Sequence, residues 1–141
     1  MHRMTDDEAL AFIAARPRTG KLATVRPDGS PHVVPIWVAV DGHSLVATLS
    51  GDSAKVRALR RNPRVSICFD DERPPFSFVT AEGAVTLSED LDELRRWAAV
   101  IGGRYMGEDR AEAYGARNGV PGEVLMRLVP DRIVGLAGVA D

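Results

Sequence analysis

A short cationic segment, residues 50–64 (SGDSAKVRALRRNPR), contains the side chains best suited to bind an anion. Five of the eighteen Lys and Arg residues lie within ten positions here: Lys55, Arg57, Arg60, Arg61 and Arg64. The formal net charge of the whole chain is -2, so the cluster is a local feature and not part of a basic protein. Three roles fit it: a solvated helix face, a nucleic-acid patch, or a cradle for a small anionic cofactor.

The first half of this segment has the groups that bind phosphate. Ser50 and Ser53 supply hydroxyls, and Lys55 lies near the start of a helix predicted over 52–61, where backbone amides are unpaired. Charge-assisted hydrogen bonds of this kind contribute about 1.5 to 3 kcal/mol each. The segment alone does not decide the role, because an amphipathic helix with its cations in water gives the same pattern.

A second candidate feature combines an interrupted strand with aromatic side chains. Pro35 lies within a strand predicted over 32–40, and its missing N–H requires a break or a sheet edge there. Trp37 follows it, while Phe76 and Phe78 are expected on one face of a strand over 76–87. A flat ring against a disrupted edge would find backbone and aromatic partners there. Half-buried strand aromatics are also typical of a core, so both interpretations stay open.

Other chemistries lack their motifs. The histidines and the single cysteine show no metal-ligand spacing, so no metal site is expected, and no catalytic residue is assigned. Neither Gly-x-Ser-x-Gly nor Ser-x-x-Lys occurs, which disfavours nucleophilic catalysis. The glycines at 102 and 103 do not form a dinucleotide fingerprint.

The elements that must position these residues are mostly strands. Thr5-Asp6-Asp7-Glu8 matches a capping box and predicts a first helix ending near Arg16. Short β-rich runs separated by turn residues follow, and the first three are expected to form a meander. Further helices are predicted over 89–100 and 109–117. The fold class is mainly β: a barrel of six to seven mostly antiparallel strands with peripheral helices, with runs at 22–26, 32–40, 45–50, 65–69, 76–87, 124–129 and 133–136.

Length and composition set the remaining expectations. The 141 residues suit one domain, 1–141, and 45% hydrophobic with 27% charged residues is ordinary globular composition. The acidic N-terminus does not resemble a signal peptide, and no apolar stretch is long enough to span a membrane. One cysteine, Cys68, excludes an internal disulfide. We therefore expect a cytoplasmic protein that acts on a small molecule and binds neither membrane nor nucleic acid.

The order of four segments resembles a known superfamily. ATVRPDGSPHVVPIWVAVDG, LVATLSGDSAKVRALRRNPRVSI, FVTAEGAVTL and LMRLVPDRIVGL are similar to pyridoxamine 5'-phosphate oxidase-like flavin and deazaflavin oxidoreductases, which have a split β-barrel. The resemblance covers about residues 5–136. Its most specific part is the strand-turn-helix over 48–63. The DDEALAF helix and AKVRALRRNPR look most like the small enzymes that use the deazaflavin coenzyme F420, with FMN as the main rival.

The resemblance also implies site residues and an assembly. Ser50, Ser53 and Lys55 would hold the cofactor phosphate, and Arg57 or Arg60 would reach more distal negative charge. The ring would lie beside Thr48 and along the segment formed by Val34, Pro35, Ile36 and Trp37. Family members are homodimers with cofactor clefts at the interface, so Phe76 and Phe78 would come from the partner subunit and form the substrate pocket.

Two departures from the family pattern narrow these expectations. The Arg/His segment that reads the substrate phosphate in pyridoxamine phosphate oxidases has no counterpart in GLAGVAD, so oxidation of vitamin B6 is not expected. Ser53 stands where close deazaflavin relatives carry a cation. The leading hypothesis is F420-dependent hydride transfer to a conjugated organic acceptor. The alternatives are an FMN-dependent flavin reductase or oxidase and a non-enzymatic flavin or deazaflavin carrier or sensor.

Overall fold

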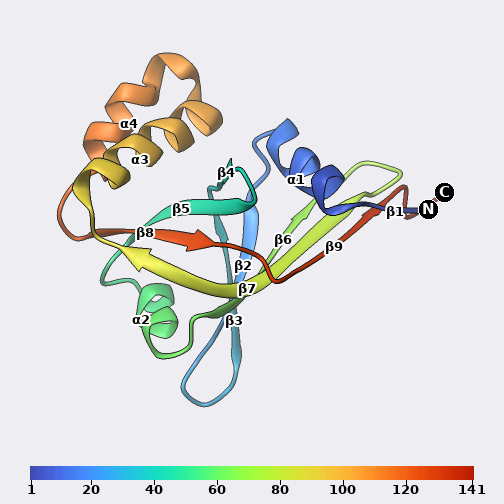
Figure 1. The fold of residues 1–141 in the computed structure, drawn as a ribbon, viewed down its shortest axis with the longest axis horizontal. Coiled ribbons are helices and arrows are strands. Elements are labelled where there is room, and N and C mark those ends of the chain that lie inside the picture. Colours follow the sequence, from blue (N-terminus) through green and yellow to red (C-terminus); the bar gives the residue numbers. More distant parts are fainter.

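The computed structural model describes residues 1–141, and most of the chain forms one curved sheet of nine strands. All strand pairs are antiparallel, and Figure 1 shows the sheet curling into a half-barrel. The predicted mainly β class is confirmed. The strands are β1 (His2–Arg3), β2 (Gly20–Val25), β3 (Pro31–Ile36), β4 (Ala39–Asp41), β5 (Ser44–Ser50), β6 (Arg64–Asp70), β7 (Phe78–Ser88), β8 (Glu123–Leu128) and β9 (Arg132–Ala137).

The helices lie outside this sheet. In Figure 1, α3 and α4 lie together beside β5, α1 lies near β9, and α2 lies beside the β2–β3 hairpin. No helix is both long and apolar enough to cross a lipid bilayer. The helices are α1 (Asp6–Ala15), α2 (Ala54–Arg61), α3 (Leu91–Met106) and α4 (Ala111–Asn118), with a 3-10 turn, η1 (Glu108–Arg110), between the last two.

The long strand β7 divides the barrel. Along one edge it pairs with β6 from Phe78 to Ala84. Its other edge changes partner: residues 78–82 pair with β9, and residues 85–88 pair with β8. The full order is β3-β2-β6-β7-β8-β5-β4, with β9 and β1 on a branch from β7. This change of partner opens the barrel.

Apolar side chains fill two regions. The larger cluster lies inside the barrel and includes the fully buried Leu22, Ile67 and Phe69. The smaller cluster lies between α3 and the outer side of the sheet and consists of Ala39, Val46, Leu94, Trp97, Ile101 and Leu125. This second core holds α3 against β4, β5 and β8.

The strand predicted over 32–40 is two strands in the structure. β3 ends at Ile36 and pairs only with β2, whereas β4 pairs only with β5 at the opposite end of the order. Both antiparallel pairings of the expected meander are therefore present, but the middle run is divided, so the three runs do not form one continuous ladder. Pro35 lies on the edge strand β3, where its missing N–H breaks no ladder. The edge position predicted for Pro35 is confirmed, and the chain leaves the sheet at Trp37 and Val38.

The structure confirms one detail of the predicted helices and corrects another. The capping box is confirmed, because Glu8 N–H donates to Thr5 Oγ1 at 3.1 Å and Thr5 N–H donates to Glu8 Oε1 at 3.0 Å. The glycines at 102 and 103 do not interrupt the helix predicted over 89–100, because α3 continues through them to Met106. Helical packing explains this, since Gly102 allows α4 to approach closely.

The strand predicted from Phe76 begins two residues later. Phe76 lies in the loop before β7, with φ of 64° and 44% exposure. Pro74 and Pro75 lack amide donors, so this part of the chain cannot extend the ladder with β6. The chain instead forms a turn where the strand was predicted to begin, and in this turn Phe76 N–H donates to Arg73 O at 2.9 Å. Phe76 and Phe78 therefore do not share a strand face, contrary to the prediction.

Candidate functional site

A cavity of about 230 Å³ lies where the chain leaves β3, beside the end of β5 and the start of α2. It brings together six residues predicted for the cofactor site. They come from segments 35–37, 48–50 and 54–61, which folding places around one space. The six are Pro35, Ile36, Trp37, Thr48, Ser50 and Lys55.

One end of the cavity is suited to an anion. Lys55 lies in the first turn of α2 and makes no ion pair within the chain, and Ser50 lies at the exposed end of β5. The first turn of α2 has no acidic side chain, so the positive end of the helix dipole is not neutralised. An ammonium group, a hydroxyl and this helix start are groups that bind phosphate.

Ser53 does not line the cavity in the structure. Its hydroxyl donates to Ser50 O at 2.7 Å and accepts from Val56 N–H at 3.3 Å. It is the N-cap of α2, so its single proton is already used within the chain. Ser53 orients the helix start that presents Lys55, and its direct contact with phosphate stays a prediction.

An aromatic pair supports the wall of the cavity that Trp37 forms. The Trp37 and Tyr105 rings stack with centroids 5.0 Å apart and planes 3° apart. The Tyr105 hydroxyl accepts from Val38 N–H at 3.0 Å and donates to Arg18 O at 2.6 Å. These bonds satisfy the backbone at the point where the chain leaves β3, and they fix the Trp37 ring that lines the cavity.

The helical wall was not predicted from the sequence. It consists of Ala98, Ile101 and Gly102 of α3 and Asn118 at the end of α4, and Leu49 completes the lining. A Cβ at Gly102 would lie 2.2 Å from Tyr114 Cβ, so glycine permits the close contact of the two helices. The adjacent glycines 102 and 103 within an amphipathic stretch were the sequence signal that indicates such close helix packing. Asn118 is the one polar side chain on this helical wall, and no pattern marked it.

Several predicted residues lie elsewhere. Val34 packs against the barrel core, Phe76 lies in the loop before β7, and Phe78 is the first residue of β7. Arg60 lines no cavity, and Arg57 lines a different one, of about 250 Å³, between α2 and the β2–β3 hairpin. The chain's own Val34, Arg57, Arg60, Phe76 and Phe78 are therefore not part of the cavity beside Trp37.

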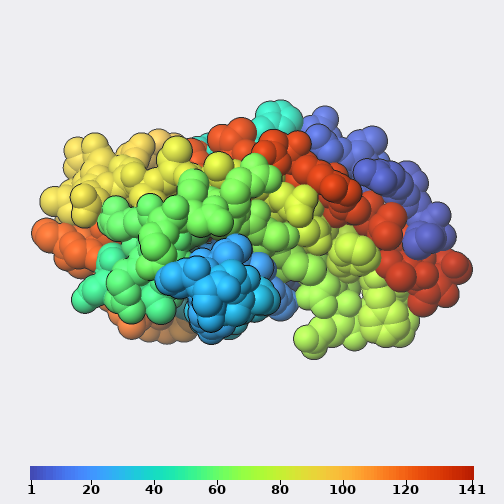
Figure 2. Space-filling view, turned by 90° about the horizontal axis from the view of Figure 1, so that it is seen from below, coloured from blue at the N-terminus to red at the C-terminus, as the bar shows by residue number.

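The cavity that contains Arg57 has a distinct charge. Arg26, Arg61 and His32 also line it, and no carboxylate does. The buried Thr24 hydroxyl, which also lines it, has no hydrogen-bond partner within the chain. Figure 2 shows α2 (green) against the β2–β3 hairpin (blue), the two elements that form this cavity. This second cavity is suited to negative charge.

Together these residues fit a flat ring that carries a phosphate. Trp37 and the backbone of an edge strand offer a planar and hydrogen-bonding side for the ring, and Lys55 with Ser50 offers an anion end. No acid-base side chain projects into the space between them. Such a donor set suits a cofactor that supplies its own reactive atom.

Comparison with known proteins places the chain in a family. The family model described as pyridoxamine 5'-phosphate oxidase matches residues 5–136. The chain belongs to this family. A family relative in Mycobacterium tuberculosis, named F420H(2)-dependent biliverdin reductase, is 30% identical over 142 residues, which cover 99% of this chain and 93% of that protein.

Solved structures agree with this membership. A conserved hypothetical protein from Mycobacterium tuberculosis superposes with a TM-score of 0.83 at 28% identity, covering 96% of this chain and 86% of that chain. A structure named F420 reductase superposes with a TM-score of 0.70 at 29% identity, covering 87% of this chain and 94% of that chain. Both of these proteins thus share the fold of this chain.

Proposed function

We propose that the protein is an oxidoreductase that uses reduced coenzyme F420 to reduce a conjugated organic acceptor. The observation that carries the proposal is the gathering of Trp37, Ser50 and Lys55 around one cavity in this family's fold. The relatives support an oxidoreductase with a flavin or deazaflavin cofactor, and two of them are named for F420. When bound, the reduced deazaflavin supplies a hydride, which with a proton from water reduces the acceptor by two electrons.

The chain's own residues would bind and orient the reactants. Lys55 and Ser50 would hold the phosphate, and Trp37, fixed by Tyr105, would lie against the ring. Ala98 and Ile101 would exclude water from the helical side of the cavity. Orientation and exclusion of water are the protein's usual contribution to cofactor chemistry.

The cavity between α2 and the hairpin favours F420 over FMN. FMN carries one phosphate, whereas F420 continues from its phosphodiester into a tail of carboxylates. Arg57 and Arg61 line a carboxylate-free cavity next to the start of α2, where such a tail would find positive charge. Arg60 lies outside it, so we assign the tail to Arg57 and Arg61. FMN with a reductase or oxidase activity remains the second candidate.

We further propose a homodimer with the cofactor cleft at its interface. Phe76 and Phe78 lie outside the cavity of their own chain, and Phe76 projects from a loop with 44% of its surface exposed. Phe76 and Phe78 of the partner subunit would then cover the ring. Sedimentation analysis tests this arrangement, because a Phe76→Ser, Phe78→Ser variant should weaken association and cofactor binding together.

Titration of the purified protein with F420 and with FMN tests the function. Trp37 should report binding through its fluorescence, and a Trp37→Phe variant separates its signal from that of Trp97 in the second core. Lys55→Ala should weaken F420 binding about tenfold, equivalent to about 1.4 kcal/mol. Arg132→Ala, which removes a cation that lines no cavity, is the control.

The results separate the candidates. Tighter binding of FMN than of F420 would favour the second candidate, and equal affinity of Lys55→Ala and the unsubstituted protein would refute the phosphate assignment. Binding without turnover would indicate a carrier or sensor. Biliverdin is the first acceptor to assay, because a relative 30% identical to this chain is named for reducing it.

A further inference from the structure

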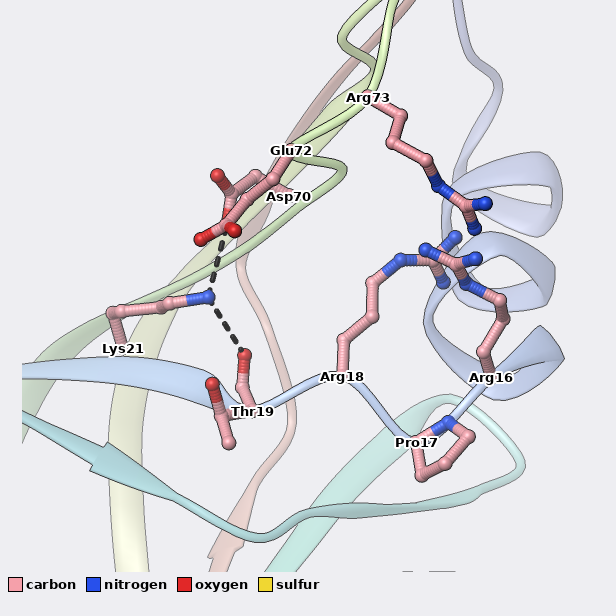
Figure 3. A pocket seen from close by; sticks show the side chains of 8 residues that line it. All are labelled: Arg16, Pro17, Arg18, Thr19, Lys21, Asp70, Glu72 and Arg73. Atoms are coloured by element: carbon pink, nitrogen blue, oxygen red, sulfur yellow. Dashed lines mark hydrogen bonds and ion pairs between the residues drawn. The ribbon is translucent and has the colours of Figure 1, made fainter.

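A charged pocket of about 540 Å³, the largest in the molecule, is lined by residues that have no role in the proposed function. It is formed by the connection between α1 and β2 and by the end of β6 with the loop that follows. No hydrophobic side chain lines it. Figure 3 shows its lining residues: Arg16, Pro17, Arg18, Thr19, Lys21, Asp70, Glu72 and Arg73.

The pocket has a strongly cationic side. In Figure 3 the guanidinium groups of Arg16, Arg18 and Arg73 converge on the side nearest α1. Arg16 Nη2 and Arg18 Nε donate to the same oxygen of Asp71, Oδ1, each at 2.8 Å. Arg73 makes no ion pair within the chain. Asp71 thus pairs with two of the three guanidinium groups, and none of its bonds reaches Arg73, which leaves positive charge and unused N–H donors facing the pocket.

The cationic side is partly rigid. The Arg18 side chain is 9% exposed, its Nη1 donates to Phe12 O, and its guanidinium lies 3.8 Å from the centre of the Phe12 ring. Arg16, which uses only Nη2 in its ion pair, is 44% exposed. A fixed guanidinium beside two with unused donors suits bidentate binding of a carboxylate.

The side of the pocket away from the guanidinium groups carries one cation and two carboxylates. Lys21 Nζ donates to Asp70 Oδ1 at 2.9 Å, so this pair is neutral overall. Glu72 makes no ion pair, and Figure 3 shows its carboxylate beside that of Asp70, away from the guanidinium groups. An anionic group would therefore bind only on the side of Arg16 and Arg73.

The charged pocket adjoins the cavity beside Trp37. Lys21 of β2 pairs directly with Pro35 of β3, so their side chains lie on the same face of the sheet at neighbouring positions. Lys21 lines the charged pocket and Pro35 lines the cavity. Arg18 O also accepts from the Tyr105 hydroxyl, whose ring supports Trp37. A molecule with its conjugated part over the cavity could thus extend an arm to the guanidinium groups.

From this adjacency we propose that the charged pocket binds carboxylate groups of the electron acceptor. The substrates of this enzyme would then be carboxylic acids with a conjugated π-system. This inference rests on the proposed function, because it assigns the acceptor of the same site. Arg16 and Arg73 would bind the carboxylate, and Arg18, held by Asp71, would fix the geometry. The pocket would then select among acceptors without taking part in hydride transfer.

Binding of biliverdin, which carries two carboxylates, and of its uncharged dimethyl ester tests this proposal. Their visible absorption allows direct titration without turnover. The unsubstituted protein should bind the diacid at least tenfold more tightly than the diester. An Arg16→Gln, Arg73→Gln variant should lose this preference. It should bind both compounds with the affinity that the unsubstituted protein has for the diester. Arg132→Gln, which removes an equally charged residue outside the pocket, should keep it.

Equal affinity for diacid and diester, no binding of the diacid, or an unchanged preference in the double variant would overturn the proposal. F420 titration of the same proteins separates this failure from failure of the proposed function. Normal F420 binding and turnover without any preference for the diacid would refute the assignment of carboxylate acceptors and leave the proposed function intact. A carboxylate preference without F420 binding would remove the function and leave an anion-binding pocket.

Discussion

Tyr105 has the most consequential single side chain beside the candidate cofactor cavity. Its ring stacks on Trp37, and its hydroxyl satisfies Val38 N–H, a backbone group of a fully buried residue. The same hydroxyl donates to Arg18 O in the connection that forms the charged pocket. One phenol therefore holds the walls of two neighbouring binding spaces.

Replacement of Tyr105 by Phe should reduce stability while keeping the stack. The variant leaves the buried Val38 N–H unpaired, so we expect the free energy of unfolding to fall by about 1 to 3 kcal/mol. Urea denaturation measures this loss. Tyr114→Phe is the matched control, because the Tyr114 hydroxyl makes no hydrogen bond within the chain, and its effect should stay under about 0.5 kcal/mol. Equal losses in the two variants would contradict this role.

The sequence predicted the loop and strand side of the candidate site but not its helical side. Lys55 and Ser50 stand out because a cation and a hydroxyl at a helix start imply a specific chemistry. Asn118 and Ala98 carry no such signal, since their place in the cavity depends on how α3 and α4 pack on the sheet. Arg57 and Arg60 were predicted together, yet helix geometry directs only Arg57 to a cavity.

At the level of elements, the sequence predicted the capping box and the two hairpins, but not the division of one run between two ends of the sheet. The capping box and both hairpin turns are determined by neighbouring residues, and the structure contains them. The division of the run 32–40 into β3 and β4 depends on pairing with β2 at one end of the sheet and β5 at the other. Periodicity within one run carries no information on its partners.

The α3–α4 pair supports a prediction from its two adjacent glycines. A Cβ at Gly102 would lie 2.2 Å from Tyr114 Cβ, so Gly102→Ala should push α4 away and lower the free energy of unfolding by about 1 to 3 kcal/mol. Gly103→Ala is the control, because its nearest neighbours are the movable Glu108 carboxylate oxygens at 2.9 and 3.0 Å. Ala111 Cβ lies farther away, at 3.1 Å, and the gain in helix propensity opposes this contact, so Gly103→Ala should cost less than Gly102→Ala. Thermal unfolding compares them, and a larger loss for Gly103→Ala would contradict this packing argument.

Across the whole molecule, ion pairs join segments that are distant in sequence. Arg16 and Arg18 follow α1, and Asp71 follows β6, so their pairing ties the first connection of the chain to the loop before β7. Figure 1 shows α1 beside that loop, at the end of the barrel where both termini lie. The hydrogen bond from Arg18 lowers the pKa of the Asp71 carboxyl, and Arg16 adds to the effect.

This lowered pKa predicts how stability depends on pH. The folded protein binds the Asp71 proton less readily than the unfolded chain, whose Asp groups titrate near a pKa of about 3.9. The contribution of Asp71 is therefore complete above that pKa and is lost as the pH falls through the lower folded pKa. Urea midpoints measured from pH 7 to about pH 2.5 should fall less steeply in Asp71→Asn, which is also less stable at pH 7. Asp109→Asn, which removes a carboxylate without an ion pair, should keep the full acid slope. An unchanged slope in Asp71→Asn would show that this connection does not govern acid stability.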